Sequence, residues 1–230
     1  MSGFRGQITL DGPSGTGKSS VARGVAARLG AAYLDTGAMY RAATVAVLDA
    51  SVDPEDADAV VRVVGEARIE VGIEAGSELV LVDGVDVASR IRGAEVTRNV
   101  SAVSAVPAVR RRLVDQQRAL VAAAGAVVVE GRDIGTVVLP DATLKIYLTA
   151  APEVRAQRRA GQLGITDPGE IAALAQDLRR RDEYDSSRGD SPLRPATDAV
   201  VVDSTDLDQQ GVVDRIVELA ASAIGAGERS

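Results

Sequence analysis

The sequence contains one glycine-rich segment whose residue types and spacing suit it to bind phosphate groups. Residues 12–19 read GPSGTGKS and match the pattern G-x-x-x-x-G-K-[ST] at every position. A strand-like stretch, ITLD, precedes the segment and a helix-like stretch follows it. Glycines let successive backbone N–H groups point inward, where they and the positive helix end cradle β- and γ-phosphates. The predicted nucleotide-binding residues are Gly12, Pro13, Ser14, Gly15, Thr16, Gly17, Lys18, Ser19 and Ser20.

Lys18 and Ser19 are the loop residues whose side chains would act on bound phosphates. Lys18 is one of only two lysines in a chain that otherwise uses arginine as its basic residue. An ammonium at this place puts a point charge against the β- and γ-oxygens, and the hydroxyl of Ser19 reaches Mg²⁺ directly or through a water. We therefore predict Mg²⁺ as the metal and Ser19 as its ligand.

The composition narrows the remaining chemistry. The chain has 230 residues, of which 46% are hydrophobic, and this is enough to bury one sizeable core. Cysteine and histidine are absent, which excludes thiol nucleophiles, Cys or His metal sites and acid–base catalysis by histidine. Phosphoryl transfer needs none of these groups, because it depends on positioning and on electrostatic stabilisation.

Charge and hydropathy predict a soluble protein. The chain has 26 basic and 33 acidic residues, a net charge of −7, and only 2% aromatic residues, which disfavours nucleic acid and anionic membrane as partners. The longest apolar stretch, near residues 119–129, is too short to span a bilayer, and residues 1–6 do not begin a secretion signal. We expect a cytoplasmic monomer with no nucleic-acid or membrane partner.

Short apolar runs alternate with helical patterns along the chain. Several runs are continuously apolar, as in strands that are buried on both faces of a parallel sheet. The predicted strands are Gln7–Asp11, Ala32–Asp35, Ala126–Glu130, Thr143–Thr149 and Asp198–Asp203. The predicted helices are Ser19–Leu29, Met39–Ala50, Pro107–Ala124, Pro152–Gly161, Glu170–Asp182 and one that opens at Thr205, with Asp208 at capping-box spacing. This alternation predicts an α/β fold of the P-loop NTPase type, three layers with a five-stranded parallel central sheet.

Two segments depart from this alternation. Residues 67–87 alternate apolar and polar side chains between glycine-containing turn signals, which predicts a small antiparallel meander. Residues 161–168 are typical of a mobile loop between two helices. We predict a single domain over residues 1–230, with an inserted subdomain at about 65–105 and a short lid at about 155–170.

A small kinase is the class of phosphate-loop protein that these residues favour. A GTPase reads guanine with an [NT]-K-x-D loop, whereas the only other lysine, Lys145, lies in the sequence LKIY. The LSGGQ signature of transporter ATPases is absent, and the chain is small for an oligomeric motor. A nucleotide-dependent binding or regulatory protein that lacks phosphoryl transfer remains an alternative.

Further segments resemble the bacterial cytidylate kinases, a family of nucleoside monophosphate kinases. The resemblance is carried by LDTGAMYR at residues 34–41, EGRDIGTVV at 130–138, RDEYDSSR at 181–188, and Ser101 with Arg110. It runs from about residue 7 to about residue 220 and includes the meander, although Thr36 stands where many relatives carry serine and Ser19-Ser20 where some carry Gly-Thr. It implies phosphoryl transfer from ATP to CMP or dCMP, and an insert that enlarges the monophosphate-binding region.

The resemblance also implies which residues bind the acceptor. They are Thr36, Tyr40, Arg41, Ser101, Arg110, Arg132, Asp133, Arg181, Asp185 and Arg188. Of these, Ser101, Arg110, Asp133 and Arg188 would read cytosine, Arg41 and Arg132 would hold the acceptor phosphate, and Arg181 and Asp185 would contact the ribose. Uracil would present the wrong hydrogen-bonding groups to Asp133. An acid at a strand end could instead hold magnesium through water, and this alternative stays open.

A group of arginines on one predicted helix face completes the catalytic set. Arg155, Arg158 and Arg159 are spaced i, i+3 and i+4 beside the loop at 161–168. In kinases of this class such a helix and loop form a lid that brings arginines onto the transferring phosphoryl group; the alternative is an exposed basic stripe. The predicted catalytic residues are Lys18, Arg132, Arg155, Arg158 and Arg159. A kinase for UMP, AMP or a small hydroxylated metabolite is the alternative within the same chemistry.

Overall fold

The computed structural model describes residues 4–187 and 191–227. The chain divides into two compact units. The first, here called the core unit, is Met1–Tyr33 together with Ala126–Ser230, and the second, the inserted unit, is Leu34–Gly125. We describe each unit by itself.

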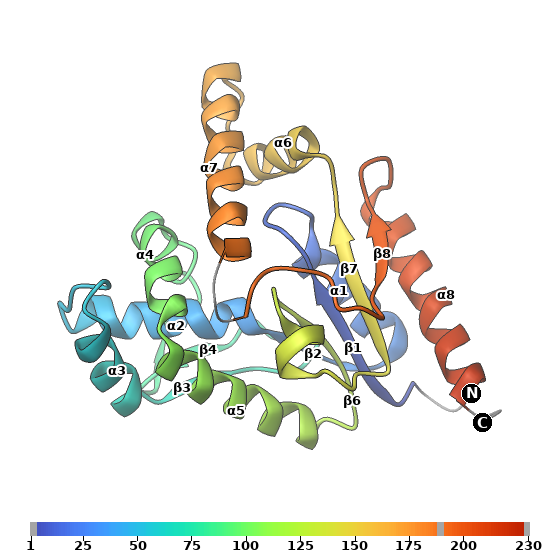
Figure 1. Ribbon diagram of the computed structural model, residues 1–230, viewed down its shortest axis with the longest axis horizontal. Helices are drawn as coiled ribbons and strands as arrows, with labels where there is room; N and C mark the ends of the chain where they lie inside the picture. The colour runs from blue at the N-terminus through green and yellow to red at the C-terminus, as the bar shows by residue number, and fades with distance from the viewer. Residues whose placement is uncertain (1–3, 188–190, 228–230) are drawn as a thin grey trace. The chain divides into compact units, whose positions relative to one another are not determined.

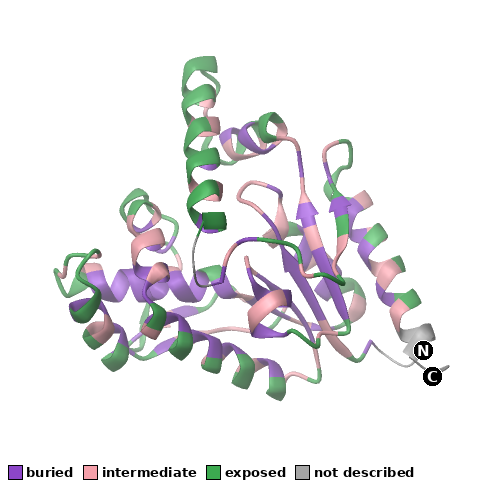
Figure 2. Cartoon of the chain, in the orientation of Figure 1, coloured by how far each residue is buried: buried purple, intermediate pink, exposed green. Residues whose placement is uncertain are grey.

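A five-stranded sheet forms the centre of the core unit (Figure 1). Its strands are β1 (Gly6–Asp11), β2 (Ala32–Asp35), β6 (Ala126–Glu130), β7 (Leu144–Thr149) and β8 (Val200–Asp203). They lie in the order β2-β6-β1-β7-β8, and β1 pairs in parallel with both β6 and β7. The predicted five-stranded parallel sheet is confirmed. The central strands are almost fully buried, which explains why their sequences are continuously apolar (Figure 2).

Helices cover the sheet within the core unit. The helical elements are α1 (Lys18–Leu29), the short π-helix η1 (Ile134–Val138), α6 (Pro152–Leu163), α7 (Pro168–Ser187) and α8 (Gln209–Gly227). Helix α1 packs against α8 and β6, and its buried Val21 and Val25 lie at helical spacing. The π-helix contacts β1 and was not apparent in the sequence, because five residues give no period to read.

Helix α8 begins later than its sequence pattern suggests. The pattern predicts an opening at Thr205, but the helix starts at Gln209. The Asp208 carboxylate accepts a hydrogen bond from the Gly211 N–H at 2.8 Å, which is the contact of an N-cap. Thr205 is instead held by Asp203, whose carboxylate accepts from its N–H at 2.8 Å and its hydroxyl at 2.6 Å. The capping residue is therefore Asp208, and Thr205 belongs to a turn.

Helices α6 and α7 pack against each other beyond the carboxyl end of β7 (Figure 1). The predicted loop at 161–168 is shorter in the structure, because α6 continues to Leu163 before Gly164 ends it with a left-handed backbone. Helix α7 is exposed along most of its length, and only Leu178 and Asp185 are buried (Figure 2). A helix with so little buried surface is held weakly and can move at low cost.

The inserted unit combines helices with a three-stranded antiparallel sheet. Its helices are α2 (Thr36–Asp49), α3 (Ala57–Glu66), α4 (Ala94–Ala105) and α5 (Pro107–Ala123), and its strands are β3 (Ile69–Val71), β4 (Val80–Val82) and β5 (Val85–Asp86). The antiparallel meander predicted from alternation is confirmed. Helix α2 begins at Thr36 because the Asp35 carboxylate accepts from the Ala38 N–H at 2.9 Å. No helix in the described part of the chain is both long and apolar enough to cross a membrane.

Candidate functional site

The phosphate loop connects β1 to α1 and depends on glycines at defined places. Gly12 has φ +145°, and a Cβ there would lie 2.0 Å from the Leu148 carbonyl oxygen. Gly15 has φ +80°, and a Cβ there would lie 3.0 Å from the Arg155 carbonyl oxygen. A side chain at either position would therefore collide with backbone. The N-cap of α1 is Gly17, which supplies no side-chain hydrogen bond, so the first N–H groups of the helix are open to an anion.

Lys18 holds the loop in its curled shape. Its ammonium donates to the carbonyl oxygens of Gly12 and Pro13, each at 2.7 Å. Burial, with a smaller contribution from the Arg132 guanidinium, lowers the pKa of Lys18 to about 7. A polyphosphate bound beside this ammonium would favour its charged form, so binding of a nucleoside triphosphate would draw a proton onto Lys18.

Arg132 joins the loop to the turn that follows β6. Its guanidinium donates to the Gly12 carbonyl oxygen at 2.6 Å and to the Ser14 hydroxyl, and its Nε lies 3.3 Å from a carboxylate oxygen of Asp185. The structure therefore brings together three predicted site groups of the core unit: the loop, the arginine predicted for the acceptor phosphate and the aspartate predicted for the ribose. Arg181 lies one turn before Asp185 on α7.

Asp182 of α7 occupies part of the phosphate loop. One oxygen of its carboxylate accepts from the Ser14 N–H at 3.1 Å, and the other accepts from the Arg155 guanidinium. Arg155 is buried and also donates to the Ser14 carbonyl oxygen at 3.0 Å. A carboxylate thus takes a loop amide and a lid arginine, both of which suit a phosphate oxygen.

The other predicted lid arginines have different contacts. Arg158 donates to the Ser204 hydroxyl at 2.9 Å and the Ser204 carbonyl oxygen at 2.7 Å, and more distantly to the Thr16 carbonyl oxygen at 3.4 Å. Arg159 donates to the Gln162 side chain on the same helix at 3.1 Å. Of the three arginines of α6, Arg155 is the one that the structure ties most closely to the phosphate loop.

Asp133 follows Arg132 and is the N-cap residue of η1. It is buried, and Asp11, the last residue of β1, is buried nearby. The Asp11 carboxylate accepts from the backbone N–H groups of Ile134 at 2.9 Å and Gly135 at 2.8 Å. Burial raises the pKa of Asp11 to about 6, although these two hydrogen bonds act in the opposite direction.

The inserted unit holds the remaining predicted side chains. Arg41 of α2 donates to the Ile91 carbonyl oxygen at 2.9 Å and to the Thr97 hydroxyl at 3.0 Å. Thr36, the first residue of α2, is buried. Arg41 is therefore not a solvated helix residue, since its guanidinium ties α2 to the turn before α4 and to α4 itself.

Tyr40 and Arg110 contact each other within the same unit. The Arg110 guanidinium lies 5.3 Å from the centroid of the Tyr40 ring, in a cation–π arrangement, and donates to the Ser104 carbonyl oxygen at 3.3 Å. The Ser104 hydroxyl in turn donates to the carbonyl oxygen of Ser101. Arg110 and Ser101 therefore both contact Ser104, and Tyr40 contacts Arg110. The other residues predicted to read cytosine belong to the core unit: Asp133 is described, whereas Arg188 lies outside the described residues.

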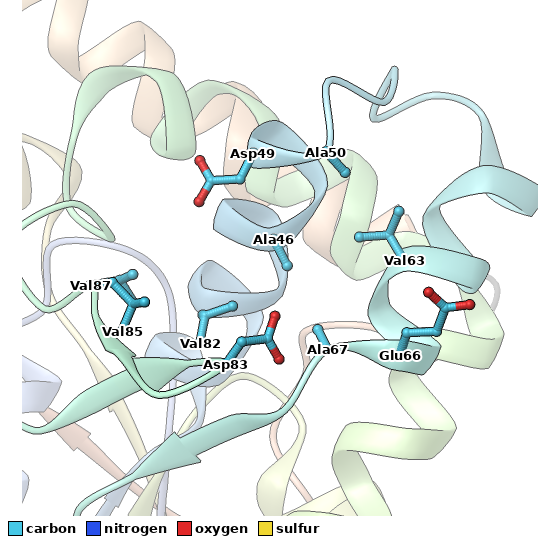
Figure 3. A pocket seen from close by; sticks show the side chains of 10 residues that line it. All are labelled: Ala46, Asp49, Ala50, Val63, Glu66, Ala67, Val82, Asp83, Val85 and Val87. Carbon is cyan, nitrogen blue, oxygen red and sulfur yellow. The ribbon is translucent and has the colours of Figure 1, made fainter.

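A groove of about 420 Å³ is also present in the inserted unit. It lies between the carboxyl end of α2, α3 and the β4–β5 hairpin. Figure 3 shows valine and alanine side chains lining it together with the carboxylates of Asp49, Glu66 and Asp83. It contains none of the predicted site residues, and its carboxylates would repel phosphate, so it is not the nucleotide site.

The donor set fits a magnesium ion that arrives with phosphates. Among the residues that the structure describes, no group of three or more acidic side chains could hold a metal by itself. Mg²⁺ commonly keeps several waters and takes one or two protein ligands together with phosphate oxygens. Ser19 is half-buried at the second position of α1, beside the open amides of the loop, and its hydroxyl suits such a role.

Two residues of this network were not found by sequence reasoning. Asp11 had a visible signal, since it is an acid that ends an apolar strand directly before the loop. Asp182 lies within the run RDEYDSSR, where nothing distinguishes it from its acidic neighbours. Its partner Ser14 is 168 positions away in the sequence, so only the folded chain reveals the contact.

Comparisons with known proteins identify the relatives of this chain. A sequence model described as cytidylate kinase matches residues 8–222. A cytidylate kinase of Rhodococcus opacus is 54% identical over 222 residues, which cover 96% of this chain and 97% of that one. A cytidylate kinase of Mycolicibacterium paratuberculosis is 53% identical over 215 residues, 92% of this chain and 93% of that one. The solved structure of a gluconokinase from Sinorhizobium meliloti shares the fold, with a TM-score of 0.54 at 17% identity over 99% of both chains.

Proposed function

The chain belongs to the cytidylate kinase family, and from this premise we propose that it transfers a phosphoryl group from ATP to CMP and dCMP. Enzymes of this kind are nucleoside monophosphate kinases. The products would be ADP and CDP or dCDP. Proteins that are more than 50% identical along nearly the whole chain usually catalyse the same reaction. The phosphate loop supports a nucleoside triphosphate as the donor.

The observation that carries the proposal is the contact between Arg132 and the phosphate loop. The guanidinium lies 2.6 Å from the Gly12 carbonyl oxygen, within the loop that would hold the donor phosphates. Arg132 is also the residue proposed to hold the acceptor phosphate. Donor and acceptor phosphates would therefore meet at one place, and fixing two reactants in such an arrangement lowers a barrier by about 7–11 kcal/mol.

Transfer would be direct, in line and without a covalent intermediate. An oxygen of the CMP phosphate attacks the γ-phosphorus of ATP while the bond from that phosphorus to the bridging oxygen of ADP breaks. The acceptor oxygen is already largely deprotonated near neutral pH, so no strong general base is needed. Lys18, Arg132 and Arg155 would offset the negative charges that oppose this approach. Bound Mg²⁺ would add its charge to theirs, with Ser19 as its protein ligand.

Selection of cytosine would rest on four polar side chains. Asp133 would accept from the N4 amino group, while Ser101, Arg110 and Arg188 would supply the donors for the remaining edge of the base. The ribose would be held by Arg181 and Asp185, and the phosphate by Arg41 together with Arg132. Thr36 and Tyr40 would line the same site. The lid would be the segment at about 155–170, most of α6 and the start of α7, with Arg158 and Arg159 as further catalytic candidates. We propose a monophosphate-binding subdomain at about 65–105, a lid at about 155–170 and a monomeric protein.

A panel of acceptors tests the proposed function. Purified protein is given ATP and Mg²⁺ with CMP, dCMP, UMP, AMP or gluconate, and ADP formation is followed. We expect kcat/KM to be highest for CMP and dCMP, with UMP lower by about 10²-fold or more because its base leaves polar groups unpaired. A preference for another acceptor would contradict the cytidylate assignment. Absence of phosphoryl transfer in a single turnover with every acceptor would instead indicate a binding protein.

A further inference from the structure

The buried carboxylate of Asp11 lies between the phosphate loop and the turn after β6 that contains Arg132 and Asp133. It ends β1, directly before Gly12, and its side chain is turned toward the start of η1. Each carboxylate oxygen accepts one backbone N–H, from Ile134 at 2.9 Å and from Gly135 at 2.8 Å. These residues follow Arg132 and Asp133 immediately. The Asp11 side chain therefore connects the phosphate loop to the segment that holds these two proposed acceptor-binding residues.

The Asp11 carboxylate supplies hydrogen-bond acceptors to the start of η1. The first N–H groups of a helix have no acceptor within it, and the side chain of the N-cap residue Asp133 does not cap η1. Asp11 supplies the acceptors from a different strand. Gly135 allows this close approach, because a Cβ there would lie 3.0 Å from the Thr9 hydroxyl oxygen and 3.2 Å from the Lys145 Cδ.

Two further hydrogen bonds join the end of β1 and the phosphate loop to the turn after β6. The Gly131 N–H donates to the Leu10 carbonyl oxygen at 3.1 Å, and the Arg132 guanidinium donates to Gly12. The segment 131–135 is therefore attached to the segment 10–12 before and after Asp133. A carboxylate in this buried place costs free energy, as the raised pKa of Asp11 shows, whereas an apolar side chain would not. The two N–H groups that donate to the Asp11 carboxylate explain why an acid stands here, whereas packing alone would favour an apolar side chain.

We propose that Asp11 is a positioning residue for acceptor recognition: its carboxylate fixes the start of η1 to the phosphate loop and so holds Asp133 in the orientation that selects the acceptor base. This inference rests on the proposed function. Asp11 itself touches neither nucleotide. Its effect is exerted through the Ile134 and Gly135 amides, and it should therefore appear in the recognition of the acceptor base more than in the binding of ATP.

The test is the variant Asp11→Asn. Asparagine keeps the size of the side chain, but its NH₂ group would face one of the two backbone N–H donors, and that hydrogen bond is lost. We expect KM for CMP to rise about tenfold, which corresponds to one charge-assisted hydrogen bond, while KM for ATP stays within about threefold of its original value. The ratio of kcat/KM for CMP to that for UMP should fall. An unchanged ratio, or equal rises in both KM values, would overturn the proposal.

Asp203→Asn is the matched control. Asp203 ends the parallel strand β8 as Asp11 ends β1, and its carboxylate also accepts a backbone N–H, from Thr205 at 2.8 Å. Its contacts are made to the turn before α8 and not to η1. The CMP to UMP ratio should be unchanged in this variant. A fall equal to that of Asp11→Asn would show that any strand-end acid produces the effect, and the proposal would fail.

Amide hydrogen exchange separates this proposal from the proposed function. Without nucleotide, the Ile134 and Gly135 amides should exchange faster in Asp11→Asn than in the parent protein. If the parent protein does not act on CMP, the proposed function fails, whatever the exchange rates. If the parent acts on CMP and exchange is faster in the variant while both KM values are unchanged, only the positioning role fails. Should Asp11→Asn not fold, Asp11→Ser, which keeps one weaker acceptor in less volume, is assayed in the same way.

Discussion

Polar groups of the phosphate loop that would bind phosphates are instead hydrogen-bonded to other protein groups. Lys18 donates to two loop carbonyls at 2.7 Å, and Asp182 accepts from the Ser14 N–H at 3.1 Å. These contacts satisfy polar groups that would otherwise be exposed or unpaired. A nucleotide must exchange them for its own oxygens, so its binding free energy is the difference between two sets of hydrogen bonds.

Replacement of Lys18 should affect the chemical step. We expect Lys18→Ala to lower kcat by about 10²- to 10³-fold, because one positive group aimed at the transferring phosphoryl is lost. The measurement is the steady-state rate with saturating ATP and CMP, together with a thermal melt to verify folding. Lys145→Ala is the matched control. Lys145 is the other lysine, lies on β7 and pairs with Asp198 at 2.8 Å. Near-normal turnover of Lys18→Ala would remove Lys18 from the mechanism.

Replacement of Asp182 should improve binding of the donor. The carboxylate competes with phosphate for the Ser14 amide and for Arg155, so Asp182→Asn should lower Kd for ATP by roughly threefold to tenfold, the equivalent of about 1 kcal/mol. Calorimetric titration with ATP measures this. Asp177→Asn serves as the control, because Asp177 is exposed on the same helix and pairs with Arg180 at 2.9 Å. Weaker ATP binding by Asp182→Asn would mean that the carboxylate keeps the loop in its binding shape.

Among the elements, α6 and α7 carry the proposed lid. They pack on each other, and α7 buries only Leu178 and Asp185. Their contacts with the phosphate loop are polar and are made through Arg155, Arg158 and Asp182. Polar contacts of this kind can be exchanged for contacts with phosphates, whereas a large apolar interface would resist movement.

Nucleotides should protect the connection between α6 and α7 from proteolysis. Leu163 ends α6 and is 50% exposed, so chymotrypsin can reach it in the free protein. With CMP and a non-hydrolysable ATP analogue bound, we expect cleavage there to slow by about tenfold, because an opening free energy larger by about 1.4 kcal/mol lowers the open population by that factor. Mass spectrometry of the fragments gives the rate, and Leu79 in the meander, 48% exposed, is the internal control. Equal rates with and without nucleotides would argue against closure.

For the whole molecule, the buried acid Asp11 links stability to pH. Burial raises the pKa of its carboxyl from the ordinary value of 3.8 to about 6, so between these values the folded state binds more protons than the unfolded state. Stability contributed by this group therefore falls as pH rises from about 4 to 6. A shift of this size corresponds to about 3 kcal/mol.

The variant Asp11→Asn isolates this contribution. Groups that do not interact with Asp11 also titrate in this range, and their contributions cancel when the two proteins are compared at each pH. We expect the free energy of unfolding of the parent, minus that of the variant, to fall by up to about 3 kcal/mol between pH 4 and pH 7. Urea denaturation at both pH values provides the measurement. A difference that is constant or rises with pH would show that the pKa of Asp11 is not raised.

Local sequence patterns were enough to predict the parts of the fold that depend on neighbouring residues. The phosphate loop is contiguous, its glycines dictate the local backbone, and the continuously apolar runs predict buried parallel strands. The meander followed from alternation over short distances. The start of α8 did not, because the sequence predicts Thr205 as the helix opening with Asp208 as its capping-box partner, and only the observed hydrogen bond shows that Asp208 itself is the cap.

Tertiary structure alone decided which distant polar groups meet. Asp11 contacts residues 123 and 124 positions away, and Asp182 contacts a residue 168 positions away. No local pattern encodes such pairs, since they arise only after β1, β6 and β7 have buried their apolar faces and brought their carboxyl ends to one edge. Hydrophobic burial sets the arrangement of the strands, and the polar contacts at that edge follow from it.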